Sequence, residues 1–440
     1  NSVEPAALIR ETDHSIPGEP FLLNIVALVP ALLAGSVANA DYHAEIRAIA
    51  ERSDVSEAFR LIESGERASD QELIALTEIP APPFAEQARA TRFAQMLSGL
   101  GLDEVSVDEV GNVLAYRRGI SGGHTVAVVA HLDTVFPADT DVTVRRQGSR
   151  LVAPGIGDNS RGLVLMLSMI RALRDAGLRT RGDILFVGSV GEEGLGDLRG
   201  VKHLFRAGGP RIDEMIAVDG GNDARILNHA IGSNRYRLNF AGPGGHSWGA
   251  FGLANPAHAL ATAIHYFTLE AADLVRAFPR SSFNIGRIGG GTSVNAIPFE
   301  SWAEVDLRSE EPSRLQQLDA VFQRAVSRAL VEHNDARTRG PALTVEVETI
   351  GRRPSGRVAT ATPLIQRAIA ATRYFGIEPV LGSGSTDANV PIALGIPATT
   401  ISRGGASGAA HSLAEWWSPK DSAIGVQKAL LLTLASVGLE

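Results

Sequence analysis

The stretch Thr125-Val-Ala-Val-Val-Ala-His131-Leu-Asp133 decides the fold of this chain. A short apolar run that stops at a histidine and an aspartate is typical of a buried parallel strand with polar residues at its end. The same pattern returns at Asp183 to Val190, followed by Glu192-Glu193, and at Met215 to Val218, followed by Asp219. Because the carboxyl ends of the strands in an open α/β sheet form its ligand crevice, these side chains are predicted to meet there.

The pattern around these strands predicts an α/β fold with two domains. Helical stretches such as Pro82 to Leu100 and Ser160 to Ala176 alternate with the strands, which favours a mostly parallel sheet with helices on both faces. After residue 232 four strand-like and two helical segments follow in about 115 residues, which indicates a smaller inserted α+β domain. We therefore expect a discontinuous domain made of residues 41–232 and 353–440, interrupted by a smaller domain at 233–352.

The first 40 residues have the pattern of a possible export signal or leader. Phe21 to Ala38 is mostly apolar and runs into Ala38-Asn39-Ala40, a small-residue pattern that a signal peptidase cuts. The usual basic start is missing, so a buried or peripheral N-terminal segment stays open as an alternative. The segment is marginal for a membrane span, and no stable span is expected. This interpretation predicts a periplasmic or secreted protein, with a cytoplasmic one as the alternative.

Composition excludes several classes of function. The 440 residues include 41 basic and 49 acidic side chains, giving a formal net charge of −8 without any long basic run. A nucleic-acid partner is therefore not expected. The chain contains no cysteine, so a thiol nucleophile is excluded and any metal must be held by His, Asp or Glu.

Two further residues complete a set that suits metal ions. Asp158 lies in the turn Gly155-Ile-Gly-Asp-Asn-Ser-Arg-Gly162, and His411 lies in Gly408-Ala-Ala-His-Ser. Two imidazoles and three carboxylates fit two divalent zinc ions with one bridging carboxylate, and cobalt or manganese is also compatible. Glu192 and Glu193 are adjacent at a strand end, so one can bind metal while the other acts as general base. Asp133 is placed to hydrogen-bond the far nitrogen of the His131 imidazole.

Each of these residues also has an explanation without metal. His131 and Asp133 can begin a polar loop, Asp158 can cap the following helix, and Asp219 can serve in a turn. The glutamate pair can lie in a solvated turn. It is the ordered set, converging on one sheet edge, that favours the metal site over these alternatives.

The motifs together resemble a known family. They are His131-Leu-Asp133, Gly157-Asp158-Asn159, Gly191-Glu192-Glu193-Gly194, Val218-Asp219-Gly220, Gly245-His246-Ser247 and the late His411. This set resembles the dinuclear zinc hydrolases that include aminoacylase, glutamate carboxypeptidase and succinyl-diaminopimelate desuccinylase. The resemblance implies a catalytic domain with an inserted lid or dimerisation domain, and a cis peptide bond after Asp158.

The resemblance also implies roles for individual residues. One zinc would be bound by His131, Asp158 and Asp219, and the other by Asp158, Glu193 and His411, with Glu192 as the general base. The lid's His246 would stabilise the oxyanion in the partner subunit of a homodimer. Five positions match substrate-binding positions of the family, and among them Arg353 matches an arginine that binds a substrate carboxylate. They are Asn295, Arg308, Arg353, Gly384 and Thr386.

The predicted function is metal-dependent hydrolysis of a peptide or N-acyl amide bond in a small substrate with a free carboxylate, as in an exopeptidase or carboxypeptidase. An N-acyl amino acid deacylase or an aminopeptidase on the same scaffold is the alternative. Two other classes remain open. Gly245-His-Ser247-Trp-Gly249 matches the nucleophile elbow of serine esterases, with Asp387 and His411 following in order. A non-catalytic binder is the second, although it would be expected to lack Glu192.

Overall fold

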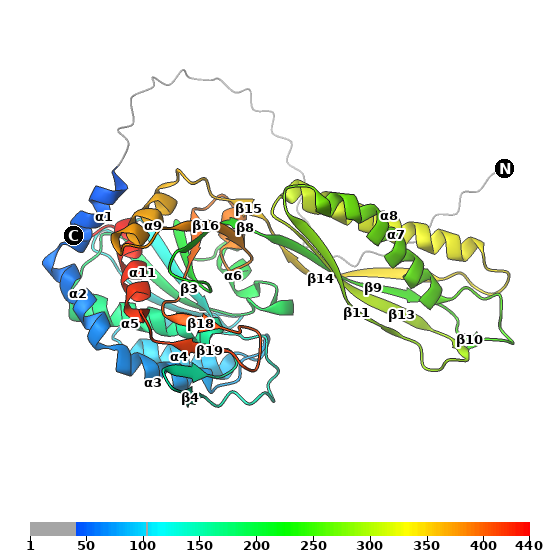
Figure 1. Cartoon of the computed structure of the whole chain (residues 1–440), viewed down its shortest axis with the longest axis horizontal. Coiled ribbons are helices and arrows are strands. Elements are labelled where there is room, and N and C mark those ends of the chain that lie inside the picture. The colour runs from blue at the N-terminus through cyan, green and yellow to red at the C-terminus, as the bar shows by residue number, and fades with distance from the viewer. Residues whose placement is uncertain (1–40, 103) are drawn as a thin grey trace, which may run out of the picture.

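The structure is a computed structural model that describes residues 41–102 and 104–440. The possible export signal at 1–40 lies outside the described residues, so the expected localisation stays a prediction. Figure 1 shows two bodies joined side by side, a larger one that contains both ends of the described chain and a smaller elongated one. The predicted interruption of one domain by another is visible in this arrangement.

A nine-stranded sheet forms the centre of the larger body. Its order is β1-β2-β6-β3-β7-β17-β8-β15, with β16 paired to β8. The four neighbours β6, β3, β7 and β17 are parallel, and antiparallel strands flank them on both sides. The strands are β1 (Glu104–Val107), β2 (Val113–Arg117), β3 (Thr125–His131), β6 (Asp183–Ser189), β7 (Glu214–Val218), β8 (Arg225–Ala230), β15 (Gly356–Arg357), β16 (Val380–Gly384) and β17 (Ala398–Ile401).

Helices cover both faces of this sheet because the central strands are apolar on both sides. Along β3, Val126 and Val128 face one hydrophobic core, and Ala127 and Val129 face another. The first core is closed mainly by α2 (Ser53–Ser64), α3 (Glu66–Thr77), α4 (Gln87–Gly99), α5 (Gly162–Asp175) and α11 (Ser422–Val437). The second is closed by α6 (Arg199–Leu204), α9 (Pro363–Tyr374) and α10 (Asn389–Ala393), while α1 (Tyr42–Ala50) packs on α9 and α11. The predicted mostly parallel sheet with helices on both faces is confirmed.

A small four-stranded sheet ties two distant segments together beside the main sheet. Its order is β18-β19-β5-β4, so the chain around residue 150 pairs with the chain around residue 417. The strands are β4 (Arg145–Gln147), β5 (Arg150–Val152), β18 (Ala406–Gly408) and β19 (Trp416–Ser418). This pairing holds the loop that carries His411 next to the turn that carries Asp158.

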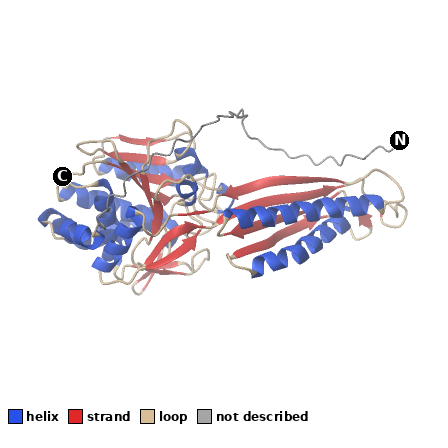
Figure 2. Ribbon diagram, turned by 90° about the horizontal axis from the view of Figure 1, so that it is seen from above, coloured by secondary structure: helices blue, strands red, loops and turns tan. Residues whose placement is uncertain are grey.

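The inserted body is an antiparallel sheet with two long helices on one face (Figure 2). The strand order is β11-β13-β9-β14, and the core lies between this sheet and the helices. The elements are β9 (Gly232–Ala241), α7 (Pro256–Arg276), β11 (Ser281–Gly290), β13 (Glu300–Ser309), α8 (Pro312–Asp335) and β14 (Thr344–Arg353). A short two-stranded antiparallel sheet of β10 (Gly245–His246) and β12 (Ala296–Ile297) lies at the end farthest from the larger body in Figure 1.

Two helix starts differ from the predictions for local reasons. The helix expected from Pro82 begins only at Gln87, because residues 80–86 form a loop in which Phe84 has a left-handed φ of 72°. The helix expected from Ser160 begins at Gly162, after a separate turn at Ile156–Arg161. Each fully buried Leu or Val of α5 contributes roughly 1.5–3 kcal/mol to folding, so this apolar helix anchors the turn.

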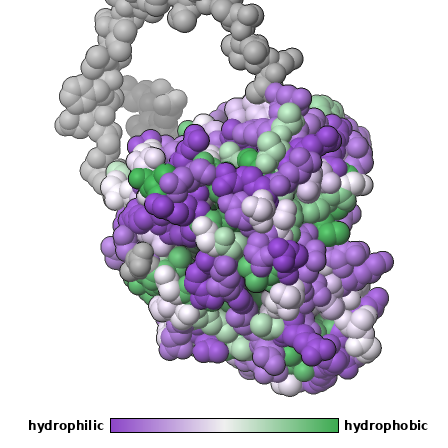
Figure 3. Space-filling view, turned by 90° about the vertical axis from the view of Figure 1, so that its left-hand side faces the viewer, coloured by the Kyte–Doolittle hydropathy of each residue, from purple (hydrophilic) through white to green (hydrophobic). Residues whose placement is uncertain are grey.

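Both bodies expose some large hydrophobic side chains. The face of the larger body turned away from the inserted one is mostly hydrophilic, with small scattered hydrophobic areas (Figure 3). In the inserted body the exposed large hydrophobic side chains include Trp248, Phe251, Phe278, Ile288, Val294 and Phe299. None of the helices that the structure describes is both long enough and apolar enough to cross a membrane.

Candidate metal centre

Three adjacent parallel strands deliver polar side chains to one edge of the main sheet. His131 ends β3, Glu192 and Glu193 follow β6, and Asp219 follows β7. Because β6, β3 and β7 are neighbours in the sheet, side chains from positions about 90 residues apart lie together. The convergence predicted from the sequence is therefore present.

Asp158 lies between the two predicted histidine ligands. Its Oδ1 is 3.2 Å from the Nε2 of His131, and its Oδ2 is 3.3 Å from the Nε2 of His411. The His411 Nε2 is also 3.0 Å from the Oε1 of Glu193. A carboxylate that turns one oxygen to each of two imidazoles has the arrangement of a bridging ligand.

The backbone around Asp158 is held by residues from elsewhere in the fold. The buried carboxylate of Glu415 accepts hydrogen bonds from the N–H groups of Gly155, Gly157 and Asp158 at 2.8, 2.9 and 2.7 Å. The Asn159 side chain donates to the carbonyl of Val218 at 2.8 Å, which ties the turn to the end of β7. The Asp158–Asn159 peptide bond is cis, as the resemblance implied.

The role of Asp133 differs from the prediction. Its carboxylate is not the partner of the imidazole, since the His131 Nδ1 donates to the backbone carbonyl of Asp133 at 2.9 Å and lies 3.8 Å from its Oδ1. The fully buried carboxylate instead accepts the backbone N–H groups of Glu192 at 3.0 Å and Glu193 at 2.7 Å. Asp133 therefore positions the glutamate pair, and the turn of the backbone itself orients His131.

Arg403 is a member of the centre that the sequence analysis missed. It lies just beyond the end of β17, is buried, and places its Nη1 3.0 Å from Asp158 and 3.5 Å from Asp219. Although burial alone would raise the pKa of Asp158, Arg403 and the two imidazoles lower that pKa well below its usual range. The strand-end pattern that selected His131 applies to β17 as well and could have indicated Arg403.

The pKa values of Asp219 and His411 are also shifted, because several carboxylates crowd the centre. Burial and then the charge of Asp158 raise the pKa of Asp219. Hydrogen bonds to Asp158 and Glu193 raise the pKa of His411 to about 10. Carboxylates packed this closely repel one another unless cations lie between them.

The donor set fits divalent metal ions. His131, Asp158 and Asp219 form one group whose ligand atoms lie within 4.8 Å of one another, and Asp158, Glu193 and His411 form a second group on the same criterion. The Nε2 of His131 is buried and has no hydrogen-bond partner among the described residues, as expected of an atom that binds a metal. The two groups share Asp158, and their N and O donors suit zinc, cobalt or manganese.

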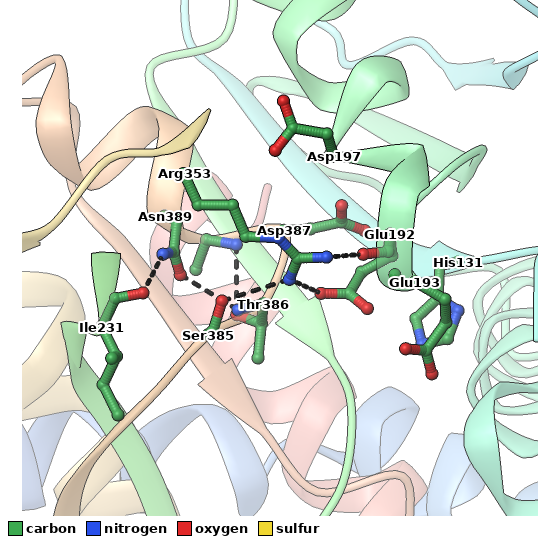
Figure 4. A network of polar contacts seen from close by, with 12 residues as sticks. His131, Glu192, Glu193, Asp197, Ile231, Arg353, Ser385, Thr386, Asp387 and Asn389 are labelled. Atoms are coloured by element: carbon green, nitrogen blue, oxygen red, sulfur yellow. Dashed lines mark hydrogen bonds and ion pairs between the residues drawn. The ribbon is translucent and has the colours of Figure 1, made fainter. Parts of the chain in front are cut away.

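Glu192 lies beside this set, paired with Arg353. The Arg353 Nη1 is 3.0 Å from the Oε1 of Glu192, its Nη2 donates to the Glu192 carbonyl, and it also contacts Ser385 (Figure 4). Burial raises the pKa of Glu192 well above its usual range, and Arg353 opposes that shift. The predicted contact of Arg353 with a substrate carboxylate stays a prediction, since its present partner is the proposed base.

A cleft of about 880 Å³ opens over the centre. Of the predicted substrate-binding residues, Arg308, Arg353, Gly384 and Thr386 line it. Asn295 lies instead beside the β10–β12 sheet at the far end of the inserted body, where the N–H of Ser247 donates to its carbonyl and His246 is the preceding residue. The structure therefore brings His246 and Asn295 together, away from the metal centre of their own chain.

The serine-esterase alternative lacks the geometry it needs. Ser247 lies in the turn after the two-residue strand β10, and the next helix begins only at Pro256. Asp387 is buried and accepts the Ser189 hydroxyl at 2.6 Å, while His411 contacts Asp158 and Glu193. The described residues therefore offer no triad around Ser247, and this alternative is wrong.

Comparisons with known proteins agree with this geometry. The family model of peptidase family M20/M25/M40 matches residues 127–434. The chain is 27% identical over 295 residues to succinyl-diaminopimelate desuccinylase of Leptothrix cholodnii, covering 63% of this chain and 74% of that protein.

Solved structures share the fold. Aminopeptidase PepT of Bacillus cereus matches with a TM-score of 0.67 at 22% identity, covering 84% of this chain and 98% of that one. The YxeP protein of Bacillus subtilis, a dinuclear metal-binding peptidase of family M20, matches with a TM-score of 0.62 at 15% identity, covering 85% and 99%. Since the family model spans well over half of the residues, the chain belongs to peptidase family M20/M25/M40 and is a metal-dependent hydrolase.

Proposed function

We propose that this protein hydrolyses the peptide or N-acyl amide bond of a small substrate with a free carboxylate, using two divalent metal ions, with zinc as the expected metal. The observation that carries the proposal is Asp158 between His131 and His411, with one carboxylate oxygen turned to each imidazole. His131 and Asp219 would bind the first ion with Asp158, and Glu193 and His411 the second. The dinuclear M20 peptidase among the structural neighbours supports the count of two.

Two bound divalent ions would acidify a water molecule and polarise the scissile carbonyl. Glu192 accepts the proton from that water and returns it to the leaving amine. Burial suits Glu192 to this task, because a raised pKa brings the carboxyl closer to the working pH. Asp133 accepts the backbone N–H groups of Glu192 and Glu193 and so fixes the turn from which both side chains extend, one to bind metal and the other to move the proton.

We propose that the active unit is a homodimer in which His246 and Asn295 serve the partner subunit's site. The Nδ1 of His246 accepts the N–H groups of Trp248 and Gly249 at 3.2 Å, which leaves Nε2 free to donate to an oxyanion. Trp248 and Phe251 nearby are 89% and 83% exposed. Two large apolar side chains exposed so close to His246 support an interaction surface at this end of the inserted body.

The substrate side of the cleft favours an exopeptidase or carboxypeptidase-like reaction. Arg308 lines the cleft and can offer its guanidinium to a substrate carboxylate. A deacylase or an aminopeptidase remains the second candidate, because the relatives include both a desuccinylase and an aminopeptidase.

Chelation and mutagenesis together test the proposal. Wild-type protein should lose amide hydrolysis in a chelator and regain it with zinc or cobalt. Glu192→Gln should lower kcat by about 10²- to 10⁴-fold while both metals are retained. Ser247→Ala is the matched control and should keep its activity. Activity that survives complete metal removal, or a Glu192→Gln variant with near-normal kcat, would contradict the mechanism.

A further inference from the structure

Arg225 occupies the wall of the cleft beside the metal centre. It begins β8 and lies over the turn that follows Asp219. A Cβ at Gly221 would lie 2.6 Å from the Arg225 Cδ, and a Cβ at Gly384 would lie 3.2 Å from its Nη2. Glycine at position 221 therefore leaves the space in which the arginine side chain lies, whereas a Cβ at Gly384 would first meet the Leu227 Cδ1 at 2.5 Å.

The guanidinium of Arg225 has no carboxylate partner in the part of the chain that the structure describes. Its Nη2 donates a long hydrogen bond of 3.4 Å to the carbonyl of Ser383. The nearest acid in sequence, Asp223, is occupied elsewhere, because it accepts the Ser402 hydroxyl and lies 4.0 Å from the Lys428 Nζ. Glu310 likewise accepts the Ser383 hydroxyl at 2.9 Å.

The acids of the cleft do not compensate this charge. Its four acidic lining residues all belong to the proposed metal centre and base, namely Asp158, Glu192, Glu193 and Asp219. Two more lining arginines, Arg235 and Arg308, share the single carboxylate of Asp306 at 3.4 and 2.7 Å. If bound metal ions neutralise these acids, the arginines leave an excess of positive charge on the substrate side of the cleft. A substrate with a neutral side chain would leave that charge unpaired.

We propose that Arg225 determines specificity by binding a second anionic group of the substrate, in addition to its free carboxylate. The inference rests on the proposed function and narrows it to substrates with an acidic side chain or acyl group next to the scissile bond, such as N-acyl or peptidyl derivatives of aspartate and glutamate. A guanidinium beside a carboxylate forms charge-assisted, often bidentate hydrogen bonds, which an amide of the same shape cannot match.

Matched substrates test this assignment on the metal-loaded enzyme. Each pair differs only by acid against amide: N-acetylglutamate and N-acetylglutamine, Ala-Glu and Ala-Gln, and Glu-Ala and Gln-Ala. Wild-type protein should prefer the acidic member of at least one pair in kcat/KM. Arg225→Gln should reduce that preference by about 10- to 100-fold, mainly through KM. Arg225→Lys should keep part of it, and the exposed Arg357→Gln, on the same sheet outside the cleft, should keep all of it.

A binding measurement separates this inference from the proposed function. Calorimetric titration should show glutamate binding more tightly than glutamine to the wild type, and equally weakly to Arg225→Gln. The role of Arg225 would be overturned if the wild type hydrolysed amides without preferring acidic substrates, or if the preference survived Arg225→Gln. Either result would leave the proposed hydrolase function standing. Failure to hydrolyse any amide would overturn the hydrolase, and the titration would still decide whether Arg225 binds an anion.

Discussion

Replacing Asp133 by asparagine would distinguish the observed role of this carboxylate from the one expected from sequence. The buried Asp133 accepts the N–H groups of Glu192 and Glu193, whereas His131 contacts only its backbone carbonyl. The substitution therefore leaves the contact of His131 intact and disturbs the glutamate pair.

The expected magnitude follows from those two hydrogen bonds. A hydrogen bond to an ionised acceptor contributes about 1.5–3 kcal/mol, and asparagine keeps one acceptor while turning its NH₂ against the other N–H. The loss of one bond together with a donor–donor contact should cost about 3 kcal/mol locally. Disturbing a residue behind a metal ligand lowers metal affinity or activity about 10- to 100-fold. The effect should fall on the ion bound by Glu193, and kcat should fall with it because Glu192 is displaced.

The assay is calorimetric titration of zinc into metal-free protein, which resolves two affinities. In Asp133→Asn the zinc affinity of the site with Glu193 should fall about 10- to 100-fold. The zinc affinity of the site with His131 should change less than about threefold. Asp183→Asn is the control, because this aspartate at the opposite end of β6 accepts the Gly119 N–H at 2.8 Å and pairs with Arg118. It should lose stability and keep both metals. Equal losses at both metal sites, or none, would refute the assignment.

Two further predictions concern Lys428 and His246. Burial lowers the pKa of Lys428 to about 8, so between pH 8 and 10.5 the unfolded state binds more protons and stability rises with pH. The free energy of unfolding in urea should rise by about 3 kcal/mol more in the wild type than in Lys428→Met between pH 7 and 10.5. A difference between the two proteins that does not change with pH would contradict this prediction. Co-expression of His246→Ala with Glu192→Gln should restore about a quarter of wild-type activity, because about half of the dimers are mixed and each mixed dimer contains one complete site. No recovery would exclude the supply of His246 by the partner subunit.

Sequence alone predicted the parallel strands and the polar side chains that meet at their ends, because both are encoded locally. An apolar run that stops at His131, at the Glu192-Glu193 pair or at Asp219 places that residue at a strand's carboxyl end, whatever the rest of the chain does. Turn residues did not predict the start of α4, because the loop before it depends on a left-handed Phe84 rather than on a cap.

Only the tertiary structure decided which groups pair with which. Arg353 contacts Glu192 across 161 positions, and Glu415 holds the turn of Asp158 across more than 250. Among the described residues Arg225 has no acidic partner, because the nearby acids are occupied. Nothing local marks these side chains, since an arginine or glutamate on a loop is equally suited to solvent. The sequence by itself determined the candidate ligands and the sheet edge where they meet, because strand direction is a local property. Their hydrogen-bond partners and the charge balance of the cleft depend on contacts between distant segments, which exist only in the folded chain.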